Sequence, residues 1–175
     1  MRTSSVYSRH DGGVPPIDDP ADTDALARYA RALADGIERE IAGWIERSAR
    51  RVLDDQGIAV DAGLAADLAG AAAAARADAV PRLRALLASD VDAQAANPLA
   101  VLRGVVGFPT AVLRAAGARP VPRDEFEQRS FPDDVYGLSP ATFADVDPSL
   151  HEPGLVWGAA KAHVHLARRR REGRR

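Results

Sequence analysis

Cysteine is absent from this chain of 175 residues, and lysine occurs only once. Without cysteine the chain cannot form disulfide bonds, thiolate zinc sites or a cysteine nucleophile. The single lysine stands against 22 arginines, an imbalance that the codon usage of GC-rich genomes produces by itself. An arginine is therefore weaker evidence for phosphate binding here than in a protein of average composition.

Long apolar runs are also missing from the sequence. The longest alanine run, Ala71–Ala75, is far short of the roughly 20 apolar residues that a membrane-spanning helix needs. The start of the chain lacks the apolar segment of a secretory signal. We therefore expect a cytoplasmic protein that does not associate with membranes.

No familiar catalytic signature occurs in the sequence. It contains no P-loop, no Gly-x-Gly-x-x-Gly, no Gly-x-Ser-x-Gly and no His-Glu-x-x-His. Folding can still assemble a site from distant residues, so these absences count against an enzyme without excluding one. We predict no bound cofactor.

A long amphipathic segment dominates the first third of the chain. Residues 1–20 are rich in glycine and proline and poor in large apolar side chains, which favours a flexible N-terminal arm. From Leu26 to Val52, apolar residues recur in steps of three and four. This spacing predicts a helix of about 30 residues that ends near Gly57.

A second helical segment follows from Asp61. Pro81 is expected to kink this helix or split it in two, because proline lacks the amide hydrogen and clashes with the preceding turn. Residues 69–79 are nearly all alanine, which allows two helices to approach closely. We predict an antiparallel hairpin over residues 21–90. Because alanine buries little apolar area, this hairpin should either pack on the second half of the chain or dimerise along its length.

The second half of the chain contains shorter helical segments separated by proline and glycine. Asn97 followed by Pro98 is typical of a helix start, and Pro153 begins a longer C-terminal helix. No stretch alternates between apolar and polar side chains as a strand does. The predicted fold class is therefore all-α. The predicted organisation is a single helical domain over residues 21–167, with a cluster of short helices and the C-terminal helix over 97–167, and a basic tail over 168–175. The expected boundaries of the short helices are Gly107, Pro109, Gly117, Asp124 to Arg129, and Ser139-Pro140.

An acidic segment with interleaved aromatic residues covers residues 124–152. It carries eight acidic residues against one base, Arg129. One hypothesis is a docking surface for a basic partner, and a second is a site for a hard cation such as Mg²⁺, which prefers oxygen ligands. A third is a solvated connection whose aromatic side chains pin short helices to the core. The candidate partner-binding residues are Phe131, Asp133, Asp134, Tyr136, Asp145 and Asp147.

The cation hypothesis also defines an alternative enzyme site. Asp133, Asp134, Asp145, Asp147 and His151 would then supply metal ligands or an acid–base pair for a metal-assisted reaction. The sequence Asp145-Val-Asp147 lacks the glycine and the terminal glutamate of a calcium-binding loop, so that motif does not apply.

A cluster of arginines ends the chain. Residues 168–175 contain six arginines and one glutamate, so the end of the chain is basic, whereas the rest of the chain is net acidic. Contact with the phosphates of a nucleic acid is one interpretation, pairing with the acidic segment is a second, and a solvated helix end is a third. The candidate phosphate-binding residues are Arg168, Arg169, Arg170, Arg171, Arg174 and Arg175.

Several short runs in the second half resemble conserved hypothetical proteins of high-GC actinobacteria. They are Phe131-Pro-Asp-Asp-Val-Tyr136, Leu138-Ser-Pro140, Asp145-Val-Asp-Pro148 and Gly158-Ala-Ala-Lys-Ala-His-Val-His165. The resemblance covers the last third to half of the chain and implies an actinobacterial source. That group brings no activity with it, so the resemblance assigns no role to any residue.

Taken together, the sequence favours a non-enzymatic helical protein that acts by protein–protein contact, as an interaction or adaptor protein or as a homodimer. The contact surface would be the acidic aromatic segment or the long hairpin. An accessory factor anchored to nucleic acid by the terminal arginines is the first alternative, and the metal-assisted enzyme is the second.

Overall fold

The computed structural model describes residues 20–88 and 97–173 of the chain. Within these ranges every regular element is a helix, which confirms the predicted all-α fold. The predicted N-terminal arm lies outside the described residues apart from Pro20. Arg174 and Arg175 also lie outside them.

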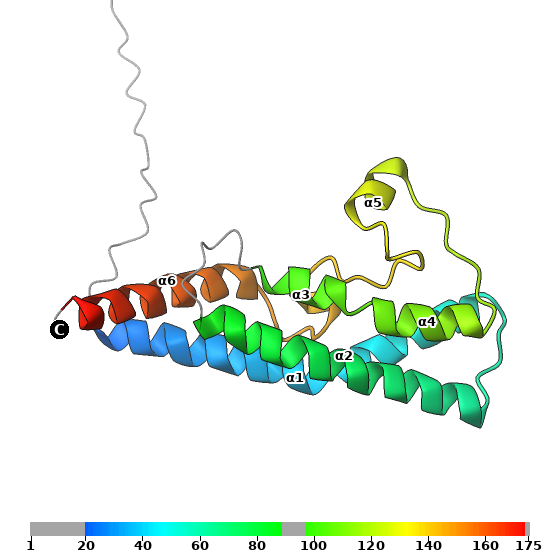
Figure 1. The fold of residues 1–175 in the computed structure, drawn as a ribbon, viewed down its shortest axis with the longest axis horizontal. Helices are drawn as coiled ribbons and strands as arrows, with labels where there is room; N and C mark the ends of the chain where they lie inside the picture. Colours follow the sequence, from blue (N-terminus) through cyan, green and yellow to red (C-terminus); the bar gives the residue numbers. More distant parts are fainter. Residues whose placement is uncertain (1–19, 89–96, 174–175) are drawn as a thin grey trace, which may run out of the picture.

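The two long helices form the predicted antiparallel hairpin (Figure 1). Helix α1 covers Pro20–Asp55 and, with 36 residues, is about 54 Å long at 1.5 Å per residue. Helix α2 covers Ala62–Ala88, and its inner face of leucine and alanine packs against α1. Gly57 has a φ of +67° in the connecting turn, a backbone conformation that glycine adopts without strain.

Pro81 does not split the second helix in two, which was one of the two effects expected of it. Helix α2 continues through Pro81 to Ala88 without a break. The side chain of Pro81 is exposed, while Ala79 and Leu83 on either side of it are buried against the rest of the molecule. Tertiary packing therefore holds the helix together across the missing hydrogen bond, as it often does when a helix buries an apolar face.

The third layer of the bundle is made of separate helices laid end to end along the hairpin (Figure 1). Helix α6 covers Pro153–Glu172 and packs on α1. Helices α3, Pro98–Gly104, and α4, Gly107–Ala115, pack on α2. The predicted start of α3 is confirmed, because the side chain of Asn97 accepts a hydrogen bond from the backbone N–H of Leu99 at 2.9 Å.

One stretch of the described residues, 98–115, has the length and apolar composition of a membrane-spanning helix. In the structure it is divided between α3 and α4, and 44% of it is buried inside the protein.

The segment between α4 and α6 contains two short helical elements. Helix α5, Glu125–Ser130, stands away from the bundle (Figure 1). The 3₁₀ helix η1 covers Phe143–Asp145. The expected helix start at Ser139-Pro140 is wrong, because the N–H of Ser139 donates instead to Asp134 Oδ2 at 2.8 Å and is held in a turn.

Candidate functional site

Asp134 and Tyr136, two of the candidate docking residues, lie in the interior. Asp134 is 3% exposed, and its carboxylate accepts the backbone N–H groups of Leu138 at 2.7 Å and Ser139 at 2.8 Å. Tyr136 is 4% exposed, and its hydroxyl donates to the carbonyl oxygen of Ala118 at 2.8 Å. Neither side chain is available to a partner, so the prediction that they form a docking surface is wrong. They hold this segment against the bundle, as the third hypothesis proposed.

Phe131 is half-buried between two arginines. The guanidinium carbon of Arg103 lies 4.8 Å from the centre of the phenyl ring, and that of Arg123 lies 6.0 Å from it. Both distances fall within the range of cation–π contacts. Arg123 also donates from Nη1 to the backbone oxygens of Phe131, at 3.0 Å, and of Asp134. Arg123 was not among the residues predicted from the sequence, where its only signal is its position directly before the acidic run.

The other three candidate docking residues lie nearer the surface. Asp133 and Asp145 are exposed, and Asp147 is half-buried. Asp145 Oδ2 accepts the N–H of Thr142 at 2.6 Å, so that this carboxylate caps η1. The backbone N–H of Ser149 donates to Asp147 Oδ1 at 2.9 Å. Two of the three are therefore engaged in local turns.

Hydrogen bonding also changes the acidity of Asp147. The hydrogen bonds from the backbone and the side chain of Ser149 lower the pKa of the Asp147 carboxyl below its ordinary value. The positive charges of Arg39 and Arg47 on α1 lower this pKa further. Such a carboxylate is stabilised in its charged form and is poorly suited to act as a general base near neutral pH.

The candidate metal ligands are not brought together by the fold. In the part of the chain that the structure describes, no three histidine, aspartate or glutamate side chains lie close enough to hold a metal ion. Asp134 is buried in a turn, Asp145 caps η1, and His151 lies exposed before α6. The geometry therefore gives the metal-assisted enzyme no support.

The arginine cluster is largely helical rather than a tail. Helix α6 continues to Glu172, so Arg168–Arg171 form part of its last turns. Arg169, Arg170 and Arg171 are exposed. In Figure 1 this end of α6 lies beside the start of α1. The predicted boundary at residue 168 is therefore wrong, because the helical hydrogen bonding of α6 carries on through the arginines.

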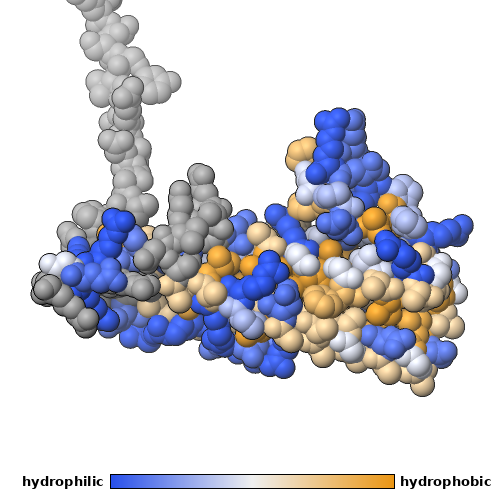
Figure 2. All heavy atoms as spheres, viewed as in Figure 1, coloured by the Kyte–Doolittle hydropathy of each residue, from blue (hydrophilic) through white to orange (hydrophobic). Residues whose placement is uncertain are grey.

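An apolar face covers the end of the molecule where α2 begins. From Ala62 to Ala75, α2 carries one charged residue, Asp67. Phe108 on α4 is 36% exposed beside it. Figure 2 shows apolar residues gathered over this end, whereas the opposite end is largely hydrophilic. We call this surface the α2–α4 face; its groove is lined by Asp67, Gly70, Ala71, Ala74, Gly107, Phe108, Ala111 and Val112.

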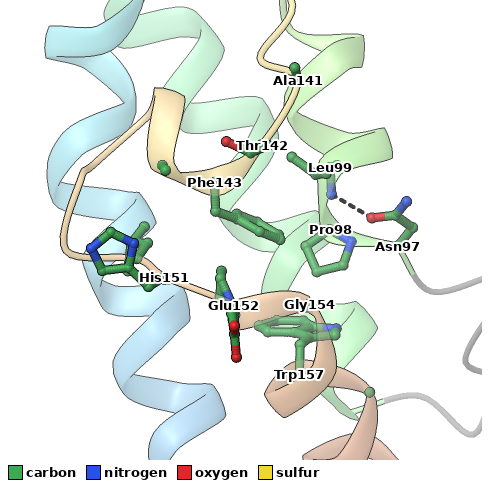
Figure 3. Close-up of a pocket in the computed structure, with 14 residues that line it drawn as sticks. Asn97, Pro98, Leu99, Ala141, Thr142, Phe143, His151, Glu152, Gly154 and Trp157 are labelled. Atoms are coloured by element: carbon green, nitrogen blue, oxygen red, sulfur yellow. Dashed lines mark hydrogen bonds between the residues drawn. The ribbon is translucent and has the colours of Figure 1, made fainter.

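A separate cavity lies where the starts of α3 and α6 meet (Figure 3). Its volume is about 750 Å³. Trp157 lines it and is 1% exposed, and no described residue accepts a hydrogen bond from its indole Nε1–H. We call it the α3–α6 cavity; its other lining residues are Asn97, Pro98, Leu99, Ala141, Thr142, Phe143, Ala144, Leu150, His151, Glu152, Pro153, Gly154 and Gly158.

Comparison with known proteins finds no family model, no curated protein and no solved structure that matches this chain. The resemblance to actinobacterial hypothetical proteins therefore stays an expectation that the sequence raises. A helical fold by itself hosts many activities, so a function for this protein has to be argued from its surfaces and cavities.

Proposed function

We propose that this chain is a helical protein-interaction protein that self-associates through the α2–α4 face. The observation that carries the proposal is the groove of small apolar side chains between the two helices, open to solvent and interrupted by one charge, Asp67. Contiguous apolar patches of this kind on a soluble protein are typical of interaction sites, because exposing them to water is unfavourable.

The pattern of small residues favours a second copy as the occupant. Gly63, Ala66, Gly70 and Ala73 follow each other in steps of three and four along the exposed side of α2. With these residues at the contact, two helix axes can approach to about 8 Å, the short end of the usual range. A two-fold axis through this stripe pairs α2 with α2 of the other copy. Phe108 at the edge of this stripe then adds a large apolar side chain, which the small residues of the stripe do not provide.

The size of the face predicts a reversible dimer. The stretch from Ala62 to Ala75 is about 21 Å long at 1.5 Å per residue, and two packed helices are about 20 Å wide. The footprint is therefore roughly 400 Å² per copy, or about 800 Å² for both, which is below the range of stable complexes at about 1,200–2,000 Å². We expect association at micromolar concentrations and dissociation on dilution.

Analytical ultracentrifugation of the full chain over a range of micromolar concentrations tests this proposal. The decisive variant is Gly70→Arg, because a Cβ at Gly70 meets nothing within 4 Å and the monomer can accept the change. Ala85→Arg adds the same charge at an exposed position of α2 outside the face. We expect the unmodified chain and Ala85→Arg to dimerise and Gly70→Arg to stay monomeric with unchanged helix content. A chain that is monomeric throughout, or a Gly70→Arg chain that still dimerises, would contradict the proposal.

Two further surfaces carry charge without a shape that selects a partner. Helix α5 exposes acidic side chains around Phe126, which is 77% exposed. The end of α6 exposes Arg169, Arg170 and Arg171. If the arginines bound nucleic acid, retention of the chain on duplex DNA would fall steeply between low and moderate salt and would be lost when all three were changed to glutamate. The proposed self-association needs neither surface, so we expect the triple variant to dimerise normally.

A further inference from the structure

We propose that acid strengthens the dimer formed through the α2–α4 face, because association brings the two copies of Asp67 together and makes them take up a proton. This inference rests on the proposed self-association and adds its regulation. Among the described residues that line the groove, Asp67 alone is charged, and it is exposed in the single chain. Burying a lone charge in an apolar contact is unfavourable unless the charge is paired or neutralised.

No group on α2 or α4 neutralises Asp67. Its carboxylate makes no hydrogen bond or ion pair with any described residue. On α2, Asp61 caps the start of the helix, and Arg76 pairs with Glu38 of α1 at 3.0 Å. On α4 the one charged residue is Arg114, which is exposed and does not line the groove.

Helix α1 also leaves Asp67 without a partner. The antiparallel packing of the hairpin places four charged residues of α1 at about the same level as Asp67; they are Glu46, Arg47, Arg50 and Arg51. None of the four lines the groove, because α1 packs against the buried side of α2. In the single chain the charge of Asp67 is therefore stabilised by water, which a second copy would displace.

The symmetry of the proposed dimer places the two copies of Asp67 next to each other. The stripe of small residues runs from Gly63 to Ala73, so its midpoint is at Leu68, one residue from Asp67. A two-fold axis that crosses α2 there makes the two helices antiparallel and turns the α4 side of both toward the same edge of the contact. Asp67 lies on that side, since it lines the groove together with α4. At 1.5 Å per residue, the two Asp67 positions are offset by about 3 Å along helices whose axes are about 8 Å apart.

Two carboxylates at this separation disfavour each other's charged form. Their repulsion is stronger where water is excluded, and the surface around them is apolar (Figure 2), with Phe108 lining the same groove. One proton shared by the pair removes the repulsion and allows a hydrogen bond from the protonated carboxyl to the charged one. Because the dimer holds this proton more tightly than the separate copies do, association strengthens as the pH falls and weakens as it rises.

Analytical ultracentrifugation of the full chain between pH 5 and pH 8 tests this inference. In this range Glu38 stays charged, because hydrogen bonds from Arg84 and Arg76 lower its pKa below 4.5, so the ion pairs between α1 and α2 are intact throughout. Uptake of one full proton per dimer changes the dissociation constant tenfold per pH unit. We expect the dissociation constant to fall at least tenfold from pH 8 to pH 5.

Asp67→Asn is the decisive variant, because it removes the charge and leaves the size of the side chain almost unchanged. Its dimer should be at least tenfold tighter than that of the unmodified chain at pH 8 and should not respond to pH. Asp133→Asn, the matched control at an exposed aspartate outside the face, should keep the full pH response. The four histidines of the chain also titrate in this range, and any response that remains in Asp67→Asn measures their contribution.

The outcomes separate this inference from the self-association on which it rests. A dimer whose dissociation constant does not change with pH would overturn the inference alone, as would a pH response that Asp67→Asn retains in full. If the unmodified chain and Asp67→Asn were both monomeric at every pH, both proposals would fail. Gly70→Arg should be monomeric over the whole range, and a pH-dependent dimer of this variant would show that the proton acts at another contact.

Discussion

Asp134 and its neighbour Asp133 show how differently two adjacent carboxylates can be placed. Asp134 is buried and accepts two backbone N–H groups, whereas Asp133 is exposed to solvent. In the sequence the two residues carry the same charge and belong to the same acidic segment. Only the buried one closes the turn that carries Tyr136 back to the carbonyl of Ala118.

Replacement of these two residues by alanine should separate their contributions. Asp134→Ala leaves the N–H groups of Leu138 and Ser139 without their acceptor in a buried turn, which costs about 1–3 kcal/mol of the free energy of unfolding. Asp133→Ala, the matched control, should change it by less than about 0.5 kcal/mol, as surface substitutions usually do. Urea denaturation followed by circular dichroism measures both. Equal losses in the two variants would show that the carboxylate of Asp134 does not stabilise the turn.

At the scale of the helix, an ion-pair network joins α1 to α2 beyond the apolar seam. Glu38 pairs with Arg84 at 2.7 Å and with Arg76 at 3.0 Å, and Arg84 also pairs with Asp35 at 2.7 Å. The hydrogen bonds from Arg84 and then Arg76 lower the pKa of Glu38 below its ordinary value of 4.5. The paired carboxylates in turn raise the pKa of Arg84.

This network makes the hairpin sensitive to acid. Because folding lowers the pKa of Glu38, its contribution to stability is fully present above pH 4.5 and is lost as the pH falls through the lowered pKa. We expect Glu38→Gln to lower the midpoint of thermal unfolding at pH 7 by a few degrees at most and to have little effect near pH 3. Glu46→Gln, on the same helix and without an ion pair among the described residues, is the control. An effect of Glu38→Gln that does not change with pH would contradict the assignment.

Pro81 gives a second prediction for α2. Alanine at this position restores the backbone hydrogen bond to the carbonyl of Ala77, and the exposed side chain leaves no cavity behind. Pro81→Ala should therefore raise the free energy of unfolding by about 1–3 kcal/mol, up to the full cost of proline in a helix interior. Pro122 is exposed and lies outside any helix. Pro122→Ala should therefore lower the free energy of unfolding by about 0.4–1 kcal/mol, because its only effect is to raise the conformational entropy of the unfolded chain. A loss of stability in Pro81→Ala would mean that the packing of α2 depends on the proline.

At the scale of the whole molecule, one continuous core links the two ends of the sequence. Trp44 on α1 and Trp157 on α6 both belong to it, although more than half of the chain separates them. Because α6 packs directly on α1, the protein should unfold as a single cooperative unit.

The two tryptophans report on this cooperativity separately. In Trp157→Phe the remaining fluorescence comes from Trp44 on α1, and in Trp44→Phe it comes from Trp157 on α6. We expect the fluorescence midpoint in urea to coincide with the circular dichroism midpoint in each variant. Fluorescence of Trp157 that changed at a lower urea concentration than the helix signal would show that α6 unfolds independently of the hairpin.

The all-α fold and most helix starts were determined by the sequence itself. Periodic apolar residues define α1 and α2, the pair Asn97-Pro98 marks the start of α3, and Pro153 marks the start of α6. These signals are local, since a helix buries residues three and four apart and its caps lie within one turn. They could therefore be recognised without knowing the neighbours of each helix.

The tertiary structure alone decided which polar residues are buried and where a cavity is left. Asp134 and Tyr136 look like surface residues in an acidic run, and only their contacts with the rest of the fold place them inside. The α3–α6 cavity exists because Pro98 and Trp157, far apart in the sequence, both line the place where the starts of two helices of the third layer meet. Burial and cavities depend on contacts between distant segments, which a local pattern of residues does not encode.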